Sequence, residues 1–551
     1  MCNFACFVTH TKLFEAMFYV LLAVIVVALF VFRKRADFSA KIVFPLILLF
    51  GTLLAIFFSP TAEDAFITYR YAENLANGFG PVWNIGERVQ GYSNFLWMVL
   101  LAFTNAITHI AIPILGKLFS YLFYVLSLLT IYRITQKLKL DSLIQLLVIL
   151  VVASFSGIAT YAISGMESSL FIFLILSFSL ALLENAFLLA ACISVLLALC
   201  RPEGMLVLPV LGIAMLVNGE LISRKLKSVV TLVIPVVGIG SYYLFVHSYY
   251  GYFIPNSVAA KKIVSIVEAI RVGKLDLSEF LTATKISVFT AFLAVLFVLS
   301  LVQRKAYDFK KADAWKGLMI FSMTIGIFAI FYVRAGGDWM PSWRYLTHVY
   351  PILIISLAVI GSLVTVGRSR VALALGLAAM CFWNLHIAFD HSQGLVRVRE
   401  WSGGGEAFEL LGKSLHETFP TPVITIASQG AGGLPFYAKL PVIDELGLND
   451  EHIARHGKRT PLYGQRIQGH LAHDYAYVMS RKPDLIMNGM GDKGVATTDY
   501  CFVQLHDNKY GISYRVYARK DRWQFIESYF KRRSTAEFSY HIIPFKADWI
   551  D

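Results

Sequence analysis

The chain has 551 residues, of which 57% are hydrophobic and only 15% are charged. An average soluble protein carries about 25% charged residues, so this composition excludes an ordinary soluble enzyme. The six cysteines include no Cys-x-x-Cys pair, which argues against a disulfide framework and against a cysteine-rich zinc site. The net charge of +13 arises in the first 388 residues, which hold 29 basic and 17 acidic residues, because the tail from residue 389 is nearly neutral.

Twelve apolar stretches have about the length that a helix needs to cross a hydrocarbon core of about 30 Å. They lie near residues 15–32, 42–58, 114–132, 142–160, 168–183, 186–200, 204–217, 228–246, 284–303, 316–333, 346–363 and 371–388. A further stretch, Asn94–Ile110, is either a span or a helix lying in the interface, and its propensity alone does not decide between them.

The basic residues favour one topology. If Asn94–Ile110 does not cross, 17 of the 29 basic residues fall in short loops on one side, which the positive-inside rule assigns to the cytoplasm. They are Arg33, Lys34, Arg35, Lys41, Arg133, Lys137, Lys139, Arg224, Lys225, Lys227, Arg304, Lys305, Lys310, Lys311, Lys316, Arg368 and Arg370. The opposite side then holds the N-terminus, residues 59–113, 161–167, 201–203, 247–283 and 334–345, and the tail.

Two further expectations follow from these charges. The first apolar stretch is followed by basic residues and has no evident small-residue cleavage site, so we expect an uncleaved reverse anchor rather than a signal peptide. Nucleic acid is not an expected partner, because the basic residues are dispersed among short loops and the tail is nearly neutral.

The tail from residue 389 changes character, because Gly, Asp, His and Pro become frequent there. Short β-like runs near residues 423–427, 441–443, 484–487 and 514–518 alternate with helical or turn segments. The sequence therefore predicts a polytopic α-helical membrane protein. We expect a membrane domain at 1–388 that includes the first outer loop at 59–113, followed by a soluble mixed α/β domain at 389–551 outside the membrane.

The first outer loop begins with an acidic pair. Residues 62–77 have the pattern of an amphipathic helix that ends at Gly78, and Glu63 and Asp64 lie at its start. One interpretation is structural: Thr61 and Asp64 form a capping box, and the helix dipole favours carboxylates there. The other is functional: a carboxylate that the dipole keeps ionised accepts a proton from an acceptor hydroxyl or binds a metal ion.

Four other outer connections combine charges with aromatic residues or glycines. They are SGMES at 164–168, RPEG at 201–204, YYGYFIPNS at 249–257 and GGDWMPSWR at 336–344. Each alone is more often an interfacial aromatic belt or a turn, but their coincidence on one face favours a site. Charges near the ends of apolar helices, such as Glu167, Arg201 and Glu203, need partners. Because aromatic rings dock sugars and Arg or Lys binds phosphate, the face suits a donor sugar carried on a lipid phosphate.

The run EDAFITYRYAENLANGFGPVWNIGERVQGYSNFLW resembles the first extracytoplasmic loop of the GT-C type, polyprenyl-phosphate-sugar-dependent glycosyltransferases. The likeness is greatest to the branch that contains the terminal arabinofuranosyltransferases and the pilin arabinosyltransferases. The four connections above and the tail segment VIDELGLNDEHIAR resemble further stretches of that branch, so the likeness spans residues 60–485.

The resemblance implies a GT-C fold of about 12 transmembrane helices plus interfacial helices, in a bacterial inner membrane with the site and the tail on the periplasmic side. It implies an inverting transferase of arabinofuranose whose catalytic base is Asp64, with Glu63 adjacent. The family more often has two aspartates at this point. Which carboxylate is the base, and whether the other binds a divalent cation, therefore stays open, and no other cofactor is expected.

The expected partners are a polyprenyl-phosphate sugar donor, membrane lipids and a glycan or protein acceptor. Arg201, Arg344 and Lys261 are the candidates for binding the donor phosphate. The candidates for binding the sugar or the acceptor are Arg70, Glu167, Tyr250, Tyr252, Asn256, Asp338, Trp339 and Trp343.

Three alternatives accompany this prediction. A transporter or flippase of lipid-linked sugars would show charges at mid-membrane or paired broken helices, and neither is clear in the sequence. A ligase that uses a lipid pyrophosphate donor would have the same face. A zinc site at His452, His456, His470 and His473 is less favoured than solvated surface histidines, because no carboxylate or water constellation accompanies them.

Overall fold

The computed structural model describes residues 4–33, 39–58, 62–220, 226–262, 265–302, 312–365, 369–390, 394–459, 471–487, 499–533 and 537–543. The chain forms two compact units. The first, called the helical unit below, comprises residues 1–60, 117–241 and 267–400, and the second, called the loop–tail unit, comprises residues 61–116, 242–266 and 401–551. The first outer loop and the tail, which are far apart in the sequence, therefore belong to one compact unit.

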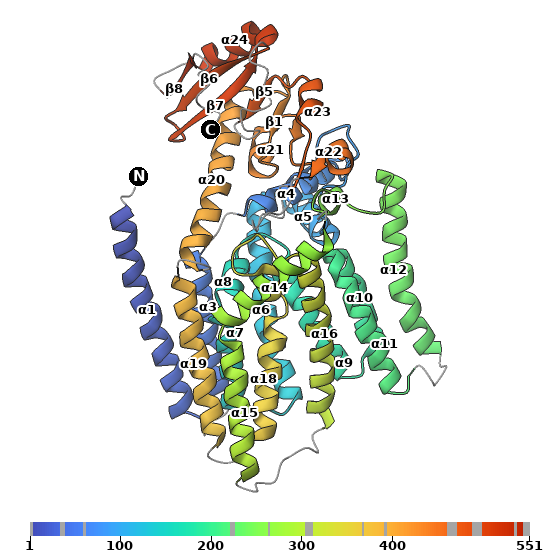
Figure 1. Ribbon diagram of the computed structural model, residues 1–551, viewed down its shortest axis with the longest axis vertical. Helices are drawn as coiled ribbons and strands as arrows, with labels where there is room; N and C mark the ends of the chain where they lie inside the picture. Colours follow the sequence, from blue (N-terminus) through green and yellow to red (C-terminus); the bar gives the residue numbers. More distant parts are fainter. Residues whose placement is uncertain are drawn as a thin grey trace. The chain divides into compact units, whose positions relative to one another are not determined.

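The helical unit is built from apolar helices (Figure 1). They are α1 (Phe4–Val31), the π-helical turn η1 (Ser39–Val43), α3 (Phe44–Phe58), α7 (Ser142–Ala153), α8 (Ser156–Ala162), α9 (Ser168–Leu183), α10 (Phe187–Cys200), the 3₁₀ turn η2 (Pro202–Val207), α11 (Leu208–Val217), α15 (Ile286–Val302), α16 (Ala312–Ala335), α17 (Arg344–Thr347), α18 (Tyr350–Val364) and α19 (Ser369–Phe389). Four further helices contain a unit boundary, namely α6 (Ile112–Lys137), α12 (Leu226–Tyr250), α14 (Ile266–Ala283) and α20 (Leu395–Thr418).

Every apolar stretch expected to cross the membrane coincides with a helix. Among the described residues, six helices are long and apolar enough to cross, namely α1, η1 with α3, α6, α12, α16 and α19. Two bent pairs, α7–α8 at 68° and α14–α15 at 60°, raise the number to eight, and α9, α10, η2–α11 and α18 are shorter apolar helices. The predicted polytopic helical fold is confirmed.

A buried amide joins three helices of the helical unit. Asn384 of α19 is fully buried, and its Nδ2 donates to the carbonyl of Val151 in α7 at 2.9 Å. The hydroxyl of Tyr350 in α18 donates to Asn384 Oδ1 at 3.3 Å. An unsatisfied buried amide costs about 1–3 kcal/mol, so this set of bonds favours one register of the three helices.

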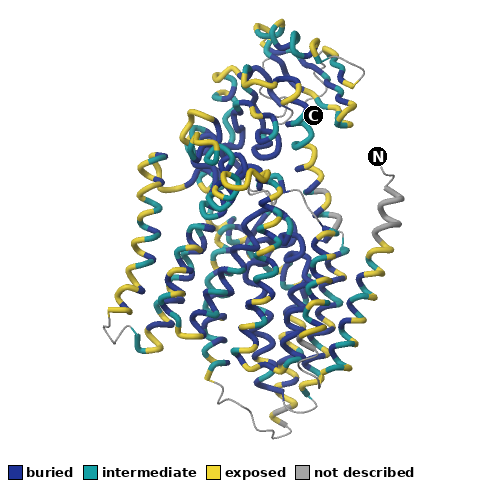
Figure 2. Tube along the Cα trace, turned by 180° about the vertical axis from the view of Figure 1, so that it is seen from behind, coloured by how far each residue is buried: buried dark blue, intermediate teal, exposed yellow. Residues whose placement is uncertain are grey.

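The outer face of α1 is apolar and exposed (Figure 2). Val20, Val24 and Val27 keep between 56% and 65% of their surface exposed. In water such a stripe is unfavourable, whereas in a bilayer it faces lipid tails of the same polarity. The exposure of these valines therefore fits a helix surrounded by lipid.

The loop–tail unit combines helices of the first outer loop with the strands of the tail (Figure 1). Its elements are α4 (Glu63–Ala76), α5 (Phe95–Thr108), α13 (Asn256–Ala260), β1 (Ile426–Ser428), α21 (Gly433–Ala438), β2 (Val442–Asp444), α22 (Glu451–His456), β3 (Lys458–Arg459), β4 (Ala472–His473), α23 (Tyr475–Ser480), β5 (Leu485–Met487), β6 (Tyr500–Asp507), β7 (Ile512–Arg519), the 3₁₀ turn η4 (Lys520–Arg522), α24 (Trp523–Arg533) and β8 (Phe538–Ile543). The stretch Asn94–Ile110 forms α5, which packs against α4, and whether it crosses the membrane stays a prediction.

The tail contains a mixed six-stranded sheet with the strand order β2-β1-β5-β7-β6-β8. Strand β1 pairs in parallel with β2 and β5, whereas β7 runs antiparallel to β5 and β6, and β8 runs antiparallel to β6. Helix α24 lies against β7 and β8 (Figure 1). The four β-like runs of the sequence correspond to β1, β2, β5 and β7, so the predicted mixed α/β tail is confirmed. The sequence did not predict β3, β4, β6 and β8.

Arg70 ties α4 to the rest of the loop–tail unit. Its side chain is buried, and its Nε donates to the carbonyl of Trp83 at 2.6 Å. Its Nη1 donates to the carbonyl of Pro435, and its Nη2 donates to Asn84 Oδ1 at 3.1 Å and to the carbonyl of Leu440 at 2.8 Å. All three guanidinium nitrogens therefore bind protein acceptors, and we assign Arg70 to the support of the site.

We predict that Arg70→Lys destabilises the loop–tail unit by about 2–4 kcal/mol. A lysine ammonium cannot reproduce the planar fork, so buried carbonyls lose their donors. The measurement is the thermal unfolding of detergent-solubilised protein followed by tryptophan fluorescence. Arg532→Lys, at an exposed position on α24 of the same unit, is the matched control. Equal unfolding temperatures for the two variants would contradict the prediction.

Candidate active site

The acidic pair occupies the first turn of α4. The helix begins at Glu63, and its N-cap Ala62 provides no side-chain cap. The first backbone N–H groups of a helix lack intrahelical acceptors, so this turn favours negative charge. Thr61 lies outside the described residues, so the capping box stays a prediction. At the other end of α4, Gly78 adopts the expected left-handed conformation with φ of 84°.

The two carboxylates of the pair have different surroundings. Glu63 Oε1 accepts hydrogen bonds from the backbone N–H of Gly432 at 2.6 Å and of Gly433 at 3.2 Å, at the start of α21. Asp64 is half-buried, and among the described residues its carboxylate has no hydrogen-bond or ion-pair partner. Glu63 is therefore committed to the fold, whereas Asp64 is available to another molecule.

Only glycine fits at position 432. A Cβ atom there would lie 2.0 Å from the carbonyl oxygen of Glu63 and 2.9 Å from its carboxyl carbon. Real Cβ contacts do not approach so closely, because the atoms would overlap. The absence of a side chain at Gly432 is what lets its N–H reach Glu63.

Burial and the neighbouring charge of Asp64 raise the pKa of Glu63 to about 8, although the bonds from Gly432 and Gly433 favour the ionised form. Glu63 is therefore protonated in most molecules at pH 7. Its protonation removes one of the two negative charges that the pair would otherwise carry.

Two tail carboxylates, at the last residue of β2 and the residue after it, belong to the same unit. Asp444 is fully buried and accepts from the N–H of Leu446 at 3.0 Å and from the N–H of Asn449 at 2.7 Å. Asn449 Oδ1 in turn accepts from the hydroxyl of Tyr71 in α4 at 3.2 Å. Burial, and then the charge of Asp444, raises the pKa of Glu445 well above its usual range. The sequence predicted no role for Asp444 and Glu445, although both lie in the tail segment VIDELGLND, whose resemblance to known transferases could have drawn attention to them.

A second cluster lies in the helical unit around Arg201. This guanidinium is buried, and its Nε donates to Glu203 Oε1 at 2.5 Å while its Nη1 donates to Glu167. Gly204 is required beside it, because a Cβ there would lie 2.1 Å from the carbonyl oxygen of Leu197. The charged residues of the RPEG and SGMES motifs therefore meet, and two carboxylates pair with one arginine.

A second buried arginine belongs to the same cluster. Arg344 forms a bidentate pair with Asp338, with Nε to Oδ2 at 2.9 Å and Nη2 to Oδ1 at 3.1 Å. The ring of Tyr345 lies 4.9 Å from the Cζ of Arg344 and 5.2 Å from the Cζ of Arg201. One aromatic ring therefore contacts both guanidiniums, and its face favours their positive charge.

The loop before Arg344 has an unusual backbone. Gly336 and Gly337 have φ of 81° and 82°, and Ser342 and Trp343 have φ of 60° and 47°. For residues with a side chain this conformation costs about 1–2 kcal/mol each. Such strain persists where the surroundings impose it and is concentrated at functional sites. It favours a functional role for this loop.

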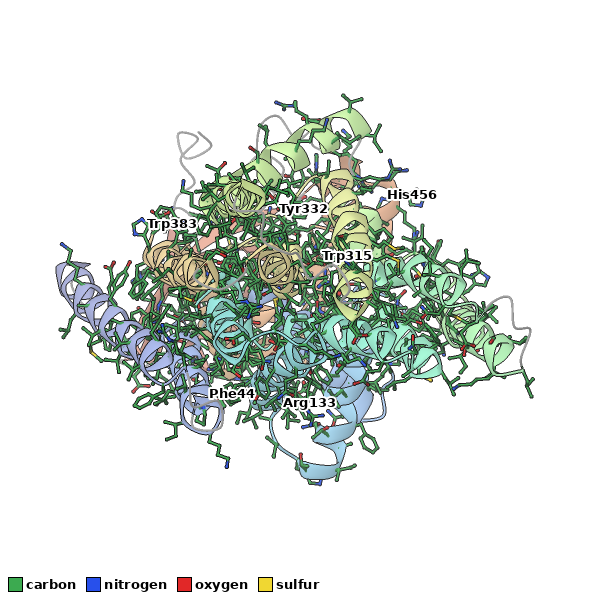
Figure 3. All side chains as sticks on the ribbon, turned by 90° about the horizontal axis from the view of Figure 1, so that it is seen from below. Phe44, Arg133, Trp315, Tyr332, Trp383 and His456 are labelled. Atoms are coloured by element: carbon green, nitrogen blue, oxygen red, sulfur yellow. The ribbon has the colours of Figure 1, made fainter. Side chains whose placement is uncertain are left out.

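The sequence did not predict two further residues of the cluster. Asp276 accepts the N–H of Asp338 at 3.2 Å and the hydroxyl of Tyr332, which lies inside the helical unit (Figure 3). His348 is 1% exposed, and neither of its ring nitrogens has a hydrogen-bond partner among the described residues. Nothing in the sequence marked Asp276 or His348, because both lie outside the motifs.

The predicted site residues divide between the two units. The loop–tail unit holds Glu63, Asp64, Arg70, Tyr250, Tyr252, Asn256 and Lys261, and the helical unit holds Glu167, Arg201, Asp338, Trp339, Trp343 and Arg344. Tyr250 is buried and donates to the carbonyl of Pro81 at 2.6 Å. Trp343 is buried against Phe280, with ring centroids 5.6 Å apart. Trp343 therefore packs inside the helical unit, whereas Tyr250 also lines a small recess of the loop–tail unit.

No group of three or more His, Cys, Asp or Glu side chains is arranged to hold a metal ion within the described part of the chain. His452 Nε2 lies 3.0 Å from Asp474 Oδ2, and its ring stacks on Tyr477 at 4.0 Å. His470 lies outside the described residues. The divalent cation beside Asp64 stays a prediction.

The fold is that of the GT-C glycosyltransferases. The structure of ArnT from Cupriavidus metallidurans in the apo state matches with a TM-score of 0.54 at 12% sequence identity, covering 87% of this chain and 98% of that protein. The structure of the same ArnT bound to undecaprenyl phosphate matches with a TM-score of 0.48 at 11% identity, covering 74% of this chain and 86% of that one. The GT-C fold expected from the sequence is confirmed.

The sequence was also compared with family models and with curated proteins. A family model described as a domain of unknown function, DUF8728, matches residues 398–542, which form most of the tail. No curated protein matches the chain.

We predict that Gly432→Ala destabilises the protein by about 2–3 kcal/mol, because the new Cβ forces α4 and α21 apart. The control is Gly403→Ala in α20, where a Cβ meets nothing within 4 Å. That change should stabilise the helix by up to about 1 kcal/mol. Thermal unfolding in detergent measures both effects, and a Gly432→Ala protein as stable as Gly403→Ala would refute the proposed contact.

We also predict that Glu63 makes the protein less stable as the pH rises from about 5 to 8. The pKa of Glu63 is about 8 in the folded protein and about 4.5 in the unfolded chain, so the folded state binds more protons over this range. Glu63→Gln cannot ionise, so its unfolding temperature should fall less steeply with pH. Parallel curves for wild type and variant, measured by scanning fluorimetry, would exclude the raised pKa.

Proposed function

We propose that the protein is an inverting glycosyltransferase that moves a sugar from a polyprenyl-phosphate donor to an acceptor hydroxyl. The observation that carries the proposal is the asymmetry of the acidic pair: Glu63 is held by two backbone amides, whereas Asp64 has no partner among the described residues. The GT-C fold and the likeness of the first outer loop support the same activity.

Asp64 is the proposed general base. It takes the proton of the acceptor hydroxyl while the hydroxyl oxygen attacks the anomeric carbon of the donor sugar. The bond between that carbon and the phosphate oxygen breaks, and the lipid phosphate leaves with the electron pair. The attack occurs opposite the leaving group, through an oxocarbenium-like state, so the configuration at the anomeric carbon inverts.

The two buried arginines are the proposed partners of the leaving phosphate. Glu167, Glu203 and Asp338 hold the two guanidiniums in place. Nη2 of Arg201 and Nη1 of Arg344 have no hydrogen-bond partner among the described residues. Fixed donors of this kind stabilise charge that develops on a leaving oxygen, because they need no reorganisation during the reaction. Lys261 is a third candidate for the same phosphate.

Arabinofuranose is the proposed sugar, a bacterial inner membrane the proposed location, and its periplasmic side the proposed side of the reaction. These three assignments rest on the resemblance of the sequence motifs. The proposed acceptor is the hydroxyl of a glycan or of a glycosylated protein.

We predict that Asp64→Asn lowers the rate of transfer by about 10²–10⁴-fold, because the amide cannot accept the proton. Glu63→Gln should retain most of the activity, since a protonated glutamate and a glutamine both lack the charge. The assay uses purified protein in lipid, polyprenyl-phosphoarabinose and a panel of hydroxyl acceptors. Asp521→Asn, at an exposed position of the tail, controls for the loss of a carboxylate.

Three outcomes would change the proposal. Transfer retained by Asp64→Asn would exclude Asp64 as the base. No transfer by folded wild-type protein would exclude this donor and lead to hexose-phosphate and pyrophosphate donors. Failure with all of them would favour a transporter of lipid-linked sugars over an enzyme.

A further inference from the structure

Helix α14 has one buried and one exposed side (Figure 1). The buried residues belong to the helical unit and are Ala269, Val272, Gly273, Asp276 and Phe280. The residues of the opposite side, called the exposed stripe below, are Val267, Arg271, Lys274, Leu275 and Ser278. Their spacing of i, i+4, i+7, i+8 and i+11 places them on one face of the helix.

The buried side fixes the rotation of α14 about its own axis. Asp276 accepts the backbone N–H of Asp338 at 3.2 Å. A Cβ atom at Gly273 would lie 2.3 Å from the carbonyl oxygen of Val333 in α16, so the two backbones are in contact there. The exposed stripe therefore cannot turn inward, and it faces whatever surrounds the helical unit.

The bend after α14 indicates its depth in a bilayer. Helix α15 has 17 residues, which is about 25 Å of helix and nearly the thickness of a hydrocarbon core of about 30 Å. The two helices form a pair that is bent by 60°. A span formed by α15 therefore leaves α14 at the end of the core, inclined toward the plane of the bilayer.

The exposed stripe combines apolar side chains with cations. Val267 keeps 73% of its surface exposed, and Leu275 keeps 59%. Arg271 and Lys274 lie between them and have no hydrogen-bond or ion-pair partner among the described residues. In water the exposed valine and leucine are unfavourable. At a lipid–water interface they enter the hydrocarbon, and the long basic side chains keep their charges among the headgroups.

The charges of α14 favour an anionic headgroup. Asp276 is buried, and Glu268 and Glu279 are half-buried, so the exposed charges of the helix are both positive. A zwitterionic headgroup brings a cation beside its phosphate, which offsets the attraction to Arg271 and Lys274. An anionic phospholipid brings a negative charge without that cation, so it interacts more favourably with the stripe.

We infer that the exposed stripe of α14 binds the headgroups of anionic phospholipids in the bilayer around the protein. The buried side of the same helix contacts the loop before Arg344, so a lipid bound to the stripe stabilises the support of that loop. The inference requires no particular reaction and stands apart from the proposed function.

The test uses full-length protein in phosphatidylcholine nanodiscs with a small fraction of photoactivatable phosphatidylglycerol. Mass spectrometry then maps the labelled residues, and wild type should be labelled on α14. The double variant Arg271→Gln, Lys274→Gln should be labelled there about 25-fold less, because each basic residue near an anionic surface strengthens binding by about fivefold. The exchange Arg271→Lys, Lys274→Arg keeps both charges and should retain the labelling.

The matched control is Lys520→Gln with Arg532→Gln, which removes two exposed cations from the tail and should leave labelling of α14 unchanged. Equal labelling of α14 in wild type and in the glutamine variant would overturn the inference. Equal labelling of wild type by a photoactivatable phosphatidylcholine would also overturn it. Displacement of the probe by polyprenyl phosphate at a far lower concentration than by phosphatidylglycerol would assign the stripe to the donor lipid instead. All of these measurements are made without donor sugar or acceptor, so they do not depend on transfer.

Discussion

The loop–tail unit depends on the hydrogen bonds that the buried guanidinium of Arg70 donates. It donates to three backbone carbonyls and one amide oxygen, taken from the first outer loop and from a tail segment more than 360 residues later. A planar fork of donors satisfies acceptors from several directions at once, which a lysine cannot do. Because these partners come from both segments, they hold the start of α4 and the N-terminus of α21 in one arrangement. That arrangement sets the positions of Glu63 and Asp64.

The acidic pair shows how neighbouring carboxylates acquire different roles. Glu63 reaches the backbone amides of Gly432 and Gly433, and burial beside a second carboxylate favours its protonated form. Asp64, one residue later on the helix, points to a different set of neighbours because successive residues of a helix are 100° apart. In the proposed reaction Glu63 positions the helix and Asp64 accepts the proton, so the Glu-Asp sequence serves in place of two aspartates.

The helical unit holds its charges in a different way. Arg201 and Arg344 are buried, and each is paired with carboxylates that hold its side chain rigid. Buried ion pairs contribute little net stability, because desolvation offsets their attraction. Desolvation of these ion pairs costs free energy, and so does the positive φ of Ser342 and Trp343. Proteins retain such unfavourable features where a site needs preorganised donors.

The sequence by itself determined where most elements lie, since hydrophobic length predicts apolar helices and alternation predicts strands. The twelve apolar stretches are helical, and α4 and four strands lie where they were expected. Six of the described helices, or eight with the two bent pairs, are long and apolar enough to cross a membrane. The RPEG and GGDWMPSWR motifs also marked arginines that the structure pairs with carboxylates. Only the tertiary structure decided that Arg70 supports the fold, that Glu63 and not Asp64 is bound by the tail, and that Asp276 and His348 join the arginine cluster. Each of these facts depends on contacts between residues far apart in the chain, and such contacts leave no local pattern in the sequence.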